Sequence, residues 1–210
     1  MDHWDLIAAE RRSLADLLDT LTPEQWATPS LCGAWTVKEV AVHLTSGPST
    51  STLTFLEAMV RALGRFDRAN QWLVARRADA EPEQVADWLR EYAEHRFTPP
   101  TMDWHAPFTD LRIHTQDIVV PLGVDAAVPL EPWRDVLGFL ASSAATRGFV
   151  PKGCPGVRWT ATDLDWSHGT GRAARGPAAA VALVLCGRPA LLDRLEGDGV
   201  PALRAWLGNP

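Results

Sequence analysis

The sequence contains almost no lysine: only Lys38 and Lys152 occur among its 210 residues, so arginine carries nearly all of the positive charge. The basic residues form no cluster, and the formal net charge is −6. Nucleic acids and anionic membranes attract proteins through basic surfaces. The composition therefore predicts that neither is a partner of this protein.

Long apolar runs are also missing. The longest, at residues 178–186, is far shorter than the roughly 20 residues that span a bilayer. The acidic start Met-Asp-His-Trp-Asp lacks the basic region and apolar stretch of a signal peptide. Cys32, Cys154 and Cys186 are an odd number without CxxC spacing, as expected for reduced thiols in the cytosol. We therefore expect a cytoplasmic protein.

Several common catalytic motifs are absent. The sequence has no GxSxG element and no HExxH element, and Cys186 lies in an apolar stretch typical of packing. These absences disfavour a serine or cysteine nucleophile. Gly169 and Gly171 could begin a dinucleotide-binding fingerprint, but Ala174 stands where the third glycine is required, which excludes that site.

Hydrophobic residues recur at helical spacing through the first two thirds of the chain. In the first segment the charged residues Glu10, Arg11 and Arg12 fall on the face opposite the leucines, and Gly47-Pro48 is expected to interrupt the second segment. The pattern predicts a four-helix-type bundle with one extra helix, ending near residue 145. Its expected helical segments are 5–21, 36–44, 53–63, 83–95, 107–123 and 133–145.

The second segment begins with a clear helix-start signal. Thr36-Val-Lys-Glu39 has the form of a capping box, in which the threonine and glutamate side chains each bond to the other's backbone N–H. The core face that follows is centred on Val40 and Leu44. His43 lies at the margin of that face, so its side chain can point into the bundle.

Segment 107–123 carries ionisable residues where a bundle helix normally buries its core face. At 100° per residue, Asp110, His114 and Asp117 lie within about 60° of one another, beside Leu111. A buried carboxylate costs several kcal/mol unless a cation, a metal or a hydrogen bond compensates it. We therefore expect this face to meet a compensating group.

Two interpretations of this face are open. In one, a carboxylate merely orients His114 in a polar core network. In the other, Asp110 and His114 are metal ligands one turn apart, and His43 completes a two-histidine, one-carboxylate set that leaves open positions for water or substrate, as catalytic sites do. Asp117 would then accept a hydrogen bond from a ligand histidine or act as the general base.

The composition changes at Arg147. Gly148, Pro151, Gly153, Pro155 and Gly156 crowd into ten residues, which is typical of a linker or domain boundary. One or two strands are expected in 157–166, then a turn at 168–171, an apolar helix at 177–185, and short helices at 190–195 and 201–207. The sequence thus predicts an α+β, mainly helical chain, with a bundle at 1–146 and a small α/β domain at 147–210.

Three blocks of the sequence, in this order, resemble the mycothiol-dependent maleylpyruvate isomerase family, which is related to the DinB-like metal-binding bundles. Phe66-Asp-Arg-Ala-Asn70, between the first two, also looks like a family feature. The ordered combination is more specific than any one block, and it covers nearly the whole chain. The blocks are Pro29-Ser-Leu-Cys-Gly-Ala-Trp-Thr-Val-Lys-Glu-Val-Ala-Val-His-Leu44, Asp110-Leu-Arg-Ile-His-Thr-Gln-Asp-Ile-Val-Val-Pro-Leu-Gly123, and Thr162-Asp-Leu-Asp-Trp with the following Gly176-Pro and Gly187-Arg-Pro.

The resemblance implies a DinB-like up-down four-helix bundle followed by a small C-terminal α/β domain. It also implies a divalent metal, usually zinc, held by His43, Asp110 and His114, and mycothiol as the cofactor. Arg188 is the best match to an arginine that helps to bind this thiol. The expected metal-binding carboxylate in the isomerase is glutamate, whereas this chain has the shorter Asp110.

We therefore expect an enzyme that activates a low-molecular-weight thiol on a divalent metal, for isomerisation or S-transfer on a small electrophilic substrate. A non-catalytic metal- or thiol-binding regulatory protein of the same fold is one alternative. A metal-hydroxide hydrolase is another. The partners expected are small molecules, and the sequence leaves the substrate, the native metal and the oligomeric state open.

Overall fold

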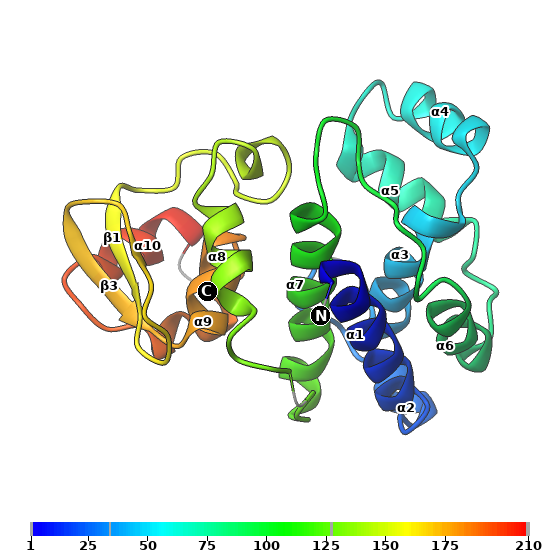
Figure 1. Ribbon diagram of the computed structural model, residues 1–210, viewed down its shortest axis with the longest axis horizontal. Coiled ribbons are helices and arrows are strands. Elements are labelled where there is room, and N and C mark those ends of the chain that lie inside the picture. The colour runs from blue at the N-terminus through cyan, green and yellow to red at the C-terminus, as the bar shows by residue number, and fades with distance from the viewer. Residues whose placement is uncertain (1, 34, 127, 209–210) are drawn as a thin grey trace. The chain divides into compact units, whose positions relative to one another are not determined.

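The computed structural model describes residues 2–33, 35–126 and 128–208 and is mostly helical, with a three-stranded sheet near the C-terminus (Figure 1). Contacts divide the chain into two compact units, Met1–Ala126 and Ala127–Pro210. The predicted fold class is confirmed, because a helical bundle is followed by a small α/β part. Within the described ranges, no helix combines the length and apolarity needed to cross a bilayer.

Four helices form the bundle of the first unit: α1 (His3–Leu18), α3 (Val37–Ser49), α6 (Pro82–Glu91) and α7 (His105–Leu122). α1 and α3 each pack against both α6 and α7. The short α2 (Pro23–Trp26) leads into α3. A helical hairpin made of α4 (Thr52–Arg61) and α5 (Phe66–Ala75) is inserted between α3 and α6 and packs on α3 through α5.

The helix-start signals of the sequence are confirmed. The Thr36 hydroxyl accepts a hydrogen bond from the backbone N–H of Glu39 at 3.3 Å, and a Glu39 carboxylate oxygen accepts one from the backbone N–H of Thr36 at 2.8 Å. Thr22 caps α2 in the same way, with Pro23 in the first turn. These caps fix where α3 begins and therefore which of its side chains face the bundle.

The expected interruption of α3 at Gly47-Pro48 is wrong: the helix continues to Ser49 with Pro48 inside it. Pro48 lacks the backbone N–H that would bond four residues back, but it lies one residue before the end of α3, so only the final turn is affected. Nearby hydroxyls add bonds to carbonyls of the same helix, from Thr45 and Ser46 to the Val42 carbonyl and from Ser49 to the Thr45 carbonyl. The last turn is therefore retained.

The prediction that Glu10 and Arg11 lie on the solvent face of α1 is also wrong. Arg11 is buried, and its Nη1 donates to the backbone carbonyls of Tyr92, Ala93 and His95 at 2.9–3.1 Å, just after α6. The Glu10 carboxylate accepts from Arg112 of α7, including from Nε at 3.0 Å. These contacts join α1 to α7 and to the segment that follows α6, so the bundle excludes water from side chains that helical spacing alone placed outside.

The second unit contains α8 (Trp133–Leu140), β1 (Val157–Ala161), β2 (Ser167–His168), β3 (Arg172–Gly176), α9 (Ala178–Leu185) and α10 (Val200–Leu207), with 3-10 turns at Ala145–Arg147 and Pro189–Arg194. The sheet order is β2-β1-β3, with β1 antiparallel to β2 and parallel to β3. The apolar α9 packs on α8 and on β1, and Asp163 accepts a hydrogen bond from the first backbone N–H of α9 at 2.8 Å. The expected apolar helix is confirmed.

The second unit differs from the sequence-based expectation in two places. β2 ends at His168, inside the expected turn, and β3 was not predicted at all. The contact boundary falls after Ala126, whereas the sequence placed it at 146/147. The physical reason is that α8 packs against α9, so this helix is part of the core of the second unit although its own spacing is that of a bundle helix.

Candidate metal centre

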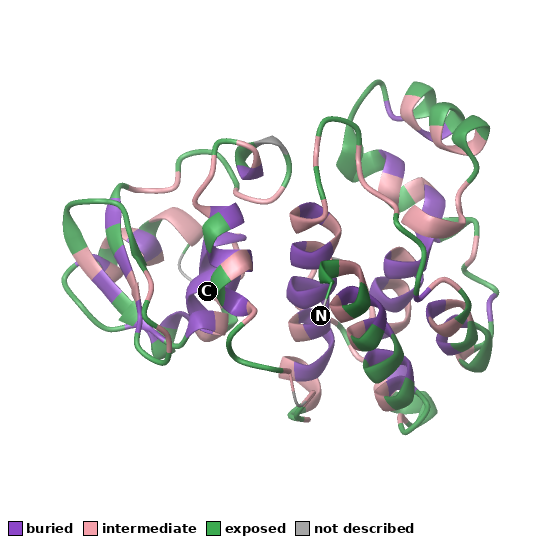
Figure 2. Cartoon of the chain, viewed as in Figure 1, coloured by how far each residue is buried: buried purple, intermediate pink, exposed green. Residues whose placement is uncertain are grey.

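The candidate centre lies on α7, which is buried along most of its length (Figure 2). The contact between Glu10 and the fully buried side chain of Arg112 fixes the rotation of α7 against α1, and the Arg112 guanidinium also lies over the Phe108 ring. Because side chains three and four residues apart share a helix face, this rotation brings Asp110, His114 and Asp117 together on the face turned to α3.

The three predicted metal ligands lie close together. Nε2 of His114 lies 3.4 Å from one carboxylate oxygen of Asp110, and Nε2 of His43 on α3 lies 3.5 Å from the other. Donor atoms bound at about 2.1 Å to one tetrahedral ion lie about 3.4 Å apart. Because one ligand atom from each of His43, Asp110 and His114 lies within 4.8 Å of the others, the three side chains could hold a single divalent cation.

The three side chains differ in exposure. The Asp110 side chain is 36% exposed, whereas those of His43 and His114 are 11% and 9% exposed. Two histidines thus form the buried side of the site, and the carboxylate lies at its solvent edge. A fourth ligand, such as water or a thiol, could approach from that edge. This arrangement is typical of catalytic metal sites, which keep one position open.

Asp117 lies behind His114. One of its oxygens is 2.9 Å from Nδ1 of His114, and its side chain is completely buried. A carboxylate at this position fixes the tautomer in which Nδ1 carries the proton and Nε2 is free to bind a metal. Of the two roles predicted for Asp117, the geometry favours the one that orients the histidine, because the buried carboxylate cannot touch a substrate.

The charges of the centre support one another. Burial would raise the pKa of Asp110, but the two neighbouring histidines outweigh it and hold that pKa well below its ordinary value. Burial would lower the pKa of His114, but the charge of Asp110 and the hydrogen bonds that the imidazole makes to Asp110, Asp117 and Cys32 raise it well above 6.5. Without a metal, a protonated His114 therefore compensates the buried carboxylate of Asp117 and the partly exposed carboxylate of Asp110, and a divalent cation would take over that role.

His43 is held differently from His114. Its Nδ1 is buried and has no hydrogen-bond partner among the residues that the structure describes. Its ring packs instead against Trp35, with ring centres 5.1 Å apart, and edge-on against His114 at 4.8 Å. The aromatic contacts orient this ring without fixing its tautomer. Ring packing therefore sets the direction in which Nε2 of His43 points, whereas the hydrogen bond to Asp117 sets that direction for Nε2 of His114.

Sequence reasoning missed the contact between α7 and the loop that joins α2 to α3 and contains Cys32. The sulfur of Cys32, in this loop, lies within 4.8 Å of a ring nitrogen of His114 and an oxygen of Asp117, both on α7. The loop is anchored by a hydrogen bond from the Leu31 backbone N–H to the Asp117 carbonyl at 3.1 Å. From the sequence alone, Cys32 is interpreted as one of three reduced thiols and as part of the first family-like block, with no role assigned at the site. No local motif identifies its position, because the contact to α7 spans about eighty residues of sequence.

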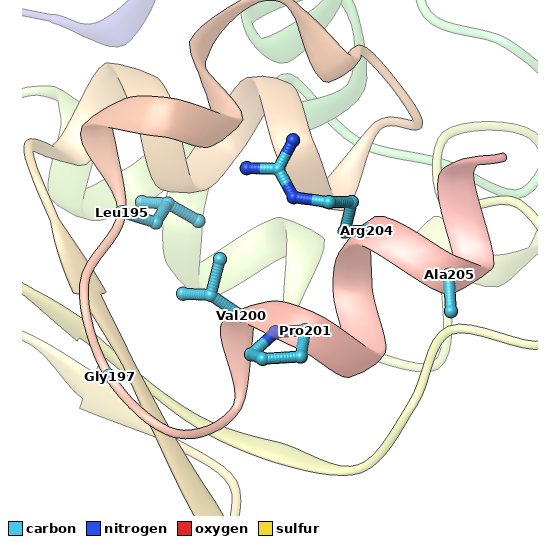
Figure 3. Close-up of a pocket in the computed structure, with 6 residues that line it drawn as sticks. All are labelled: Leu195, Gly197, Val200, Pro201, Arg204 and Ala205. Atoms are coloured by element: carbon cyan, nitrogen blue, oxygen red, sulfur yellow. The ribbon is translucent and has the colours of Figure 1, made fainter. Parts of the chain in front are cut away.

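Two further features lie in the second unit. Arg188, the predicted thiol-binding residue, donates from Nη1 to the Cys186 carbonyl at 2.9 Å at the end of α9, and its role stays a prediction. An open hollow of about 760 Å³ is lined by Leu195, Gly197, Val200, Pro201, Arg204 and Ala205 (Figure 3). The one charged side chain in that lining, Arg204, is paired with Asp193, so the hollow offers no acid–base or metal-binding group.

Comparisons with known proteins agree with this architecture. Residues 7–103 match the family model for the mycothiol maleylpyruvate isomerase N-terminal domain, which includes His43 but ends before Asp110. No curated protein matches the sequence. Among solved structures, a mycothiol-dependent maleylpyruvate isomerase has a similar fold, with a TM-score of 0.55, 16% identity, and coverage of 94% of this chain and 95% of that one. A mutant of such an isomerase matches equally well at 15% identity.

Proposed function

Because residues 7–103 belong to the mycothiol maleylpyruvate isomerase N-terminal domain family, we propose that this chain is a mycothiol-dependent metalloenzyme. Its reaction is the isomerisation of a small electrophilic substrate, or the transfer of the thiol to it. The observation that carries the proposal is the convergence of two imidazole nitrogens and one carboxylate at 3.4–3.5 Å, with one exposed edge.

The proposed ligands are His43, Asp110 and His114. A divalent cation bound there, zinc being the expected one, would lower the pKa of a coordinated thiol so that it is a thiolate near neutral pH. The two buried histidines bind from the inner side, and Asp110 leaves the outer side open to the thiol. Although Asp110 is one methylene shorter than glutamate, it reaches both histidines at ligand spacing, which supports its assignment in place of the longer residue.

Other residues orient the ligands and exclude water. With a metal bound, Asp117 would accept the Nδ1 proton of His114 and orient the ring so that Nε2 is the ligand atom. Trp35 covers His43, and the Leu31–Asp117 backbone bond holds the loop between α2 and α3 on α7. None of these groups has to move a proton during turnover. In this proposal the reacting thiol and the substrate supply the bonds that change, while the chain supplies position and charge.

The cellular setting is part of the proposal. None of the three cysteines forms a disulfide in the part of the chain that the structure describes, and Cys32 lies beside the proposed ligand His114. An oxidising compartment would endanger both this thiol and the thiol cofactor. We therefore assign the enzyme to the cytoplasm, acting on small molecules.

The test is a pair of titrations on the full chain. Metal-loaded and chelator-treated protein are titrated with mycothiol, and cis-alkene isomerisation and thiol transfer to electrophiles are then assayed. The proposal expects thiol binding and turnover only in the loaded form, with both lost in His114→Ala and retained in the control His168→Ala, which changes an exposed histidine of the second unit. Metal binding without thiol binding would contradict it and favour a hydrolase. Thiol binding without turnover would favour a regulatory protein.

A further inference from the structure

Helix α4 carries apolar side chains on two faces, and the rest of its unit covers one of them. The covered face packs Ala58 and Ala62 against Ala69 and Leu73 of α5. The other face begins at Leu53 and continues to Leu63, two residues beyond the end of the helix. We call this second set the α4 stripe, and it consists of Leu53, Leu56, Val60 and Leu63.

The α4 stripe concentrates the exposed large hydrophobic side chains of the molecule. Among the residues that the structure describes, six such side chains are exposed; four form the stripe, and Phe66 at the start of α5 is a fifth. Their exposed fractions run from 47% to 82%. Single exposed leucines are ordinary, but a contiguous set on one helical hairpin indicates a surface that binds another molecule.

The backbone at Leu63 gives a second, independent indication. Leu63 ends α4 in the left-handed region with φ of 52°, at a position where helices usually place glycine. The Leu63 and Gly64 N–H groups bond to the Val60 and Met59 carbonyls, which completes the helix end. A leucine is strained in this conformation, and its 82% exposed side chain gains little from its own unit. A contact outside that unit would explain why an apolar residue occupies this place.

The spacing of the stripe identifies the kind of partner that fits. On the helix itself, Leu53, Leu56 and Val60 are separated by three and four positions, which is the a/d spacing by which two helices pack side by side, and Leu63 follows just beyond the helix end. We propose that the α4 stripe is the interface between two copies of this chain. The copies pair antiparallel about a two-fold axis, so that Leu56 of each copy meets Val60 of the other and Leu53 meets Leu63. This inference is independent of the proposed chemistry.

Area and charge both favour a second copy. The stripe and Phe66 together expose roughly 500–700 Å² of mainly apolar surface, if each fully exposed side chain offers on the order of 150–200 Å². A standard interface buries about 800 Å² per partner, so this surface would form its apolar centre. Along the edge of the stripe, Glu57 and Arg61 neutralise each other at 2.9 Å. No unpaired charge of this pair therefore opposes close approach of two copies at the stripe. A uniformly anionic membrane surface, by contrast, would repel a chain with a net charge of −6.

The test is sedimentation equilibrium of the full chain over about 1–200 μM, the range in which a modest interface dissociates. We expect the wild type to reach twice the mass of the chain, and Leu56→Glu and Val60→Lys each to sediment as monomers. Both changes are at exposed positions, and circular dichroism checks that the variants fold. Leu130→Glu, which changes the sixth exposed hydrophobic residue, should leave the dimer intact.

Mixing the two monomeric variants tests the antiparallel pairing itself. In that arrangement the glutamate introduced in one chain faces the lysine introduced in the other, and the remaining Leu56 and Val60 also meet, so a mixed dimer should form. A wild type that stays monomeric at the highest concentration would overturn the proposal. A dimer that survives both single changes would overturn it as well, because the interface would then lie elsewhere. Failure of the mixture to associate would overturn the antiparallel arrangement.

Discussion

Replacing Asp117 by asparagine should weaken metal binding without abolishing it. The asparagine oxygen can still accept the Nδ1 proton of His114 at the 2.9 Å distance, but the negative charge that strengthens this bond is lost. Carboxylates that orient a ligand histidine are typically worth about 10–100-fold in metal affinity, or roughly 1.4–2.7 kcal/mol. Because Asp117 is completely buried, little of this effect is screened by solvent. Asp110→Asn, by contrast, removes a ligand and should abolish tight binding.

The assay is competition with a chromophoric chelator, run on both variants and the wild type side by side. Asp103→Asn is a matched control, because Asp103 also lies 2.9 Å from a histidine Nδ1, that of His105, outside the centre. We expect wild-type affinity in the control, an affinity lower by about 10–100-fold in Asp117→Asn, and no tight binding in Asp110→Asn. If Asp117→Asn empties the site while Asp110→Asn keeps the ion, the assignment of the two carboxylates is reversed and this reasoning is wrong.

Three further predictions concern proton binding, the thiol and the bundle. The pKa of His114 in the folded protein is raised above 6.5, so protonation of His114 stabilises the metal-free protein fully below pH 6.5. Urea unfolding midpoints should show this stability being lost as the pH rises through the raised pKa. Midpoints that His114→Gln leaves unaffected would contradict the prediction. Arg188→Ala should raise the KM for the thiol and leave metal content unchanged, and an unchanged KM would restrict Arg188 to its contact at the end of α9. Arg11→Leu should lower the free energy of unfolding in urea by about 2–4 kcal/mol, because the carbonyls that follow α6 lose their hydrogen-bond donor. The control Arg12→Ala, at the exposed neighbouring position, should lower it by less than about 1 kcal/mol. Equal losses would refute the structural role of Arg11.

Local rules predicted the parts of this molecule that depend on neighbouring residues. The capping box at Thr36 and Glu39 fixes the start of α3, and a four-residue spacing puts Asp110 and His114 on one face. The free-energy cost of burying a carboxylate on the core face of a bundle helix then predicted a compensating group for Asp110 and Asp117. Both arguments need only helix geometry and desolvation, and the structure bears out the geometry on which they rest.

Long-range contacts account for what the sequence did not predict. Arg11 and Glu10 look solvent-exposed by spacing, but α6 and α7 bring carbonyls and a guanidinium to meet them. β3 has the sequence Arg-Ala-Ala-Arg-Gly, without β-branched or aromatic residues, and it is a strand because β1 pairs with it. Cys32 reaches α7 only through the folded loop. In each case the partner, rather than the segment itself, determines the environment.

The central claim is that one divalent ion is held by His43, Asp110 and His114, and metal content tests it most directly. Protein purified without chelator should contain about one divalent ion per chain by elemental analysis. His43→Ala and His114→Ala should each remove it, because two remaining ligands hold such an ion weakly. His168→Ala should retain it. Full metal content in both variants, or none in the wild type after reconstitution with zinc, would contradict the account.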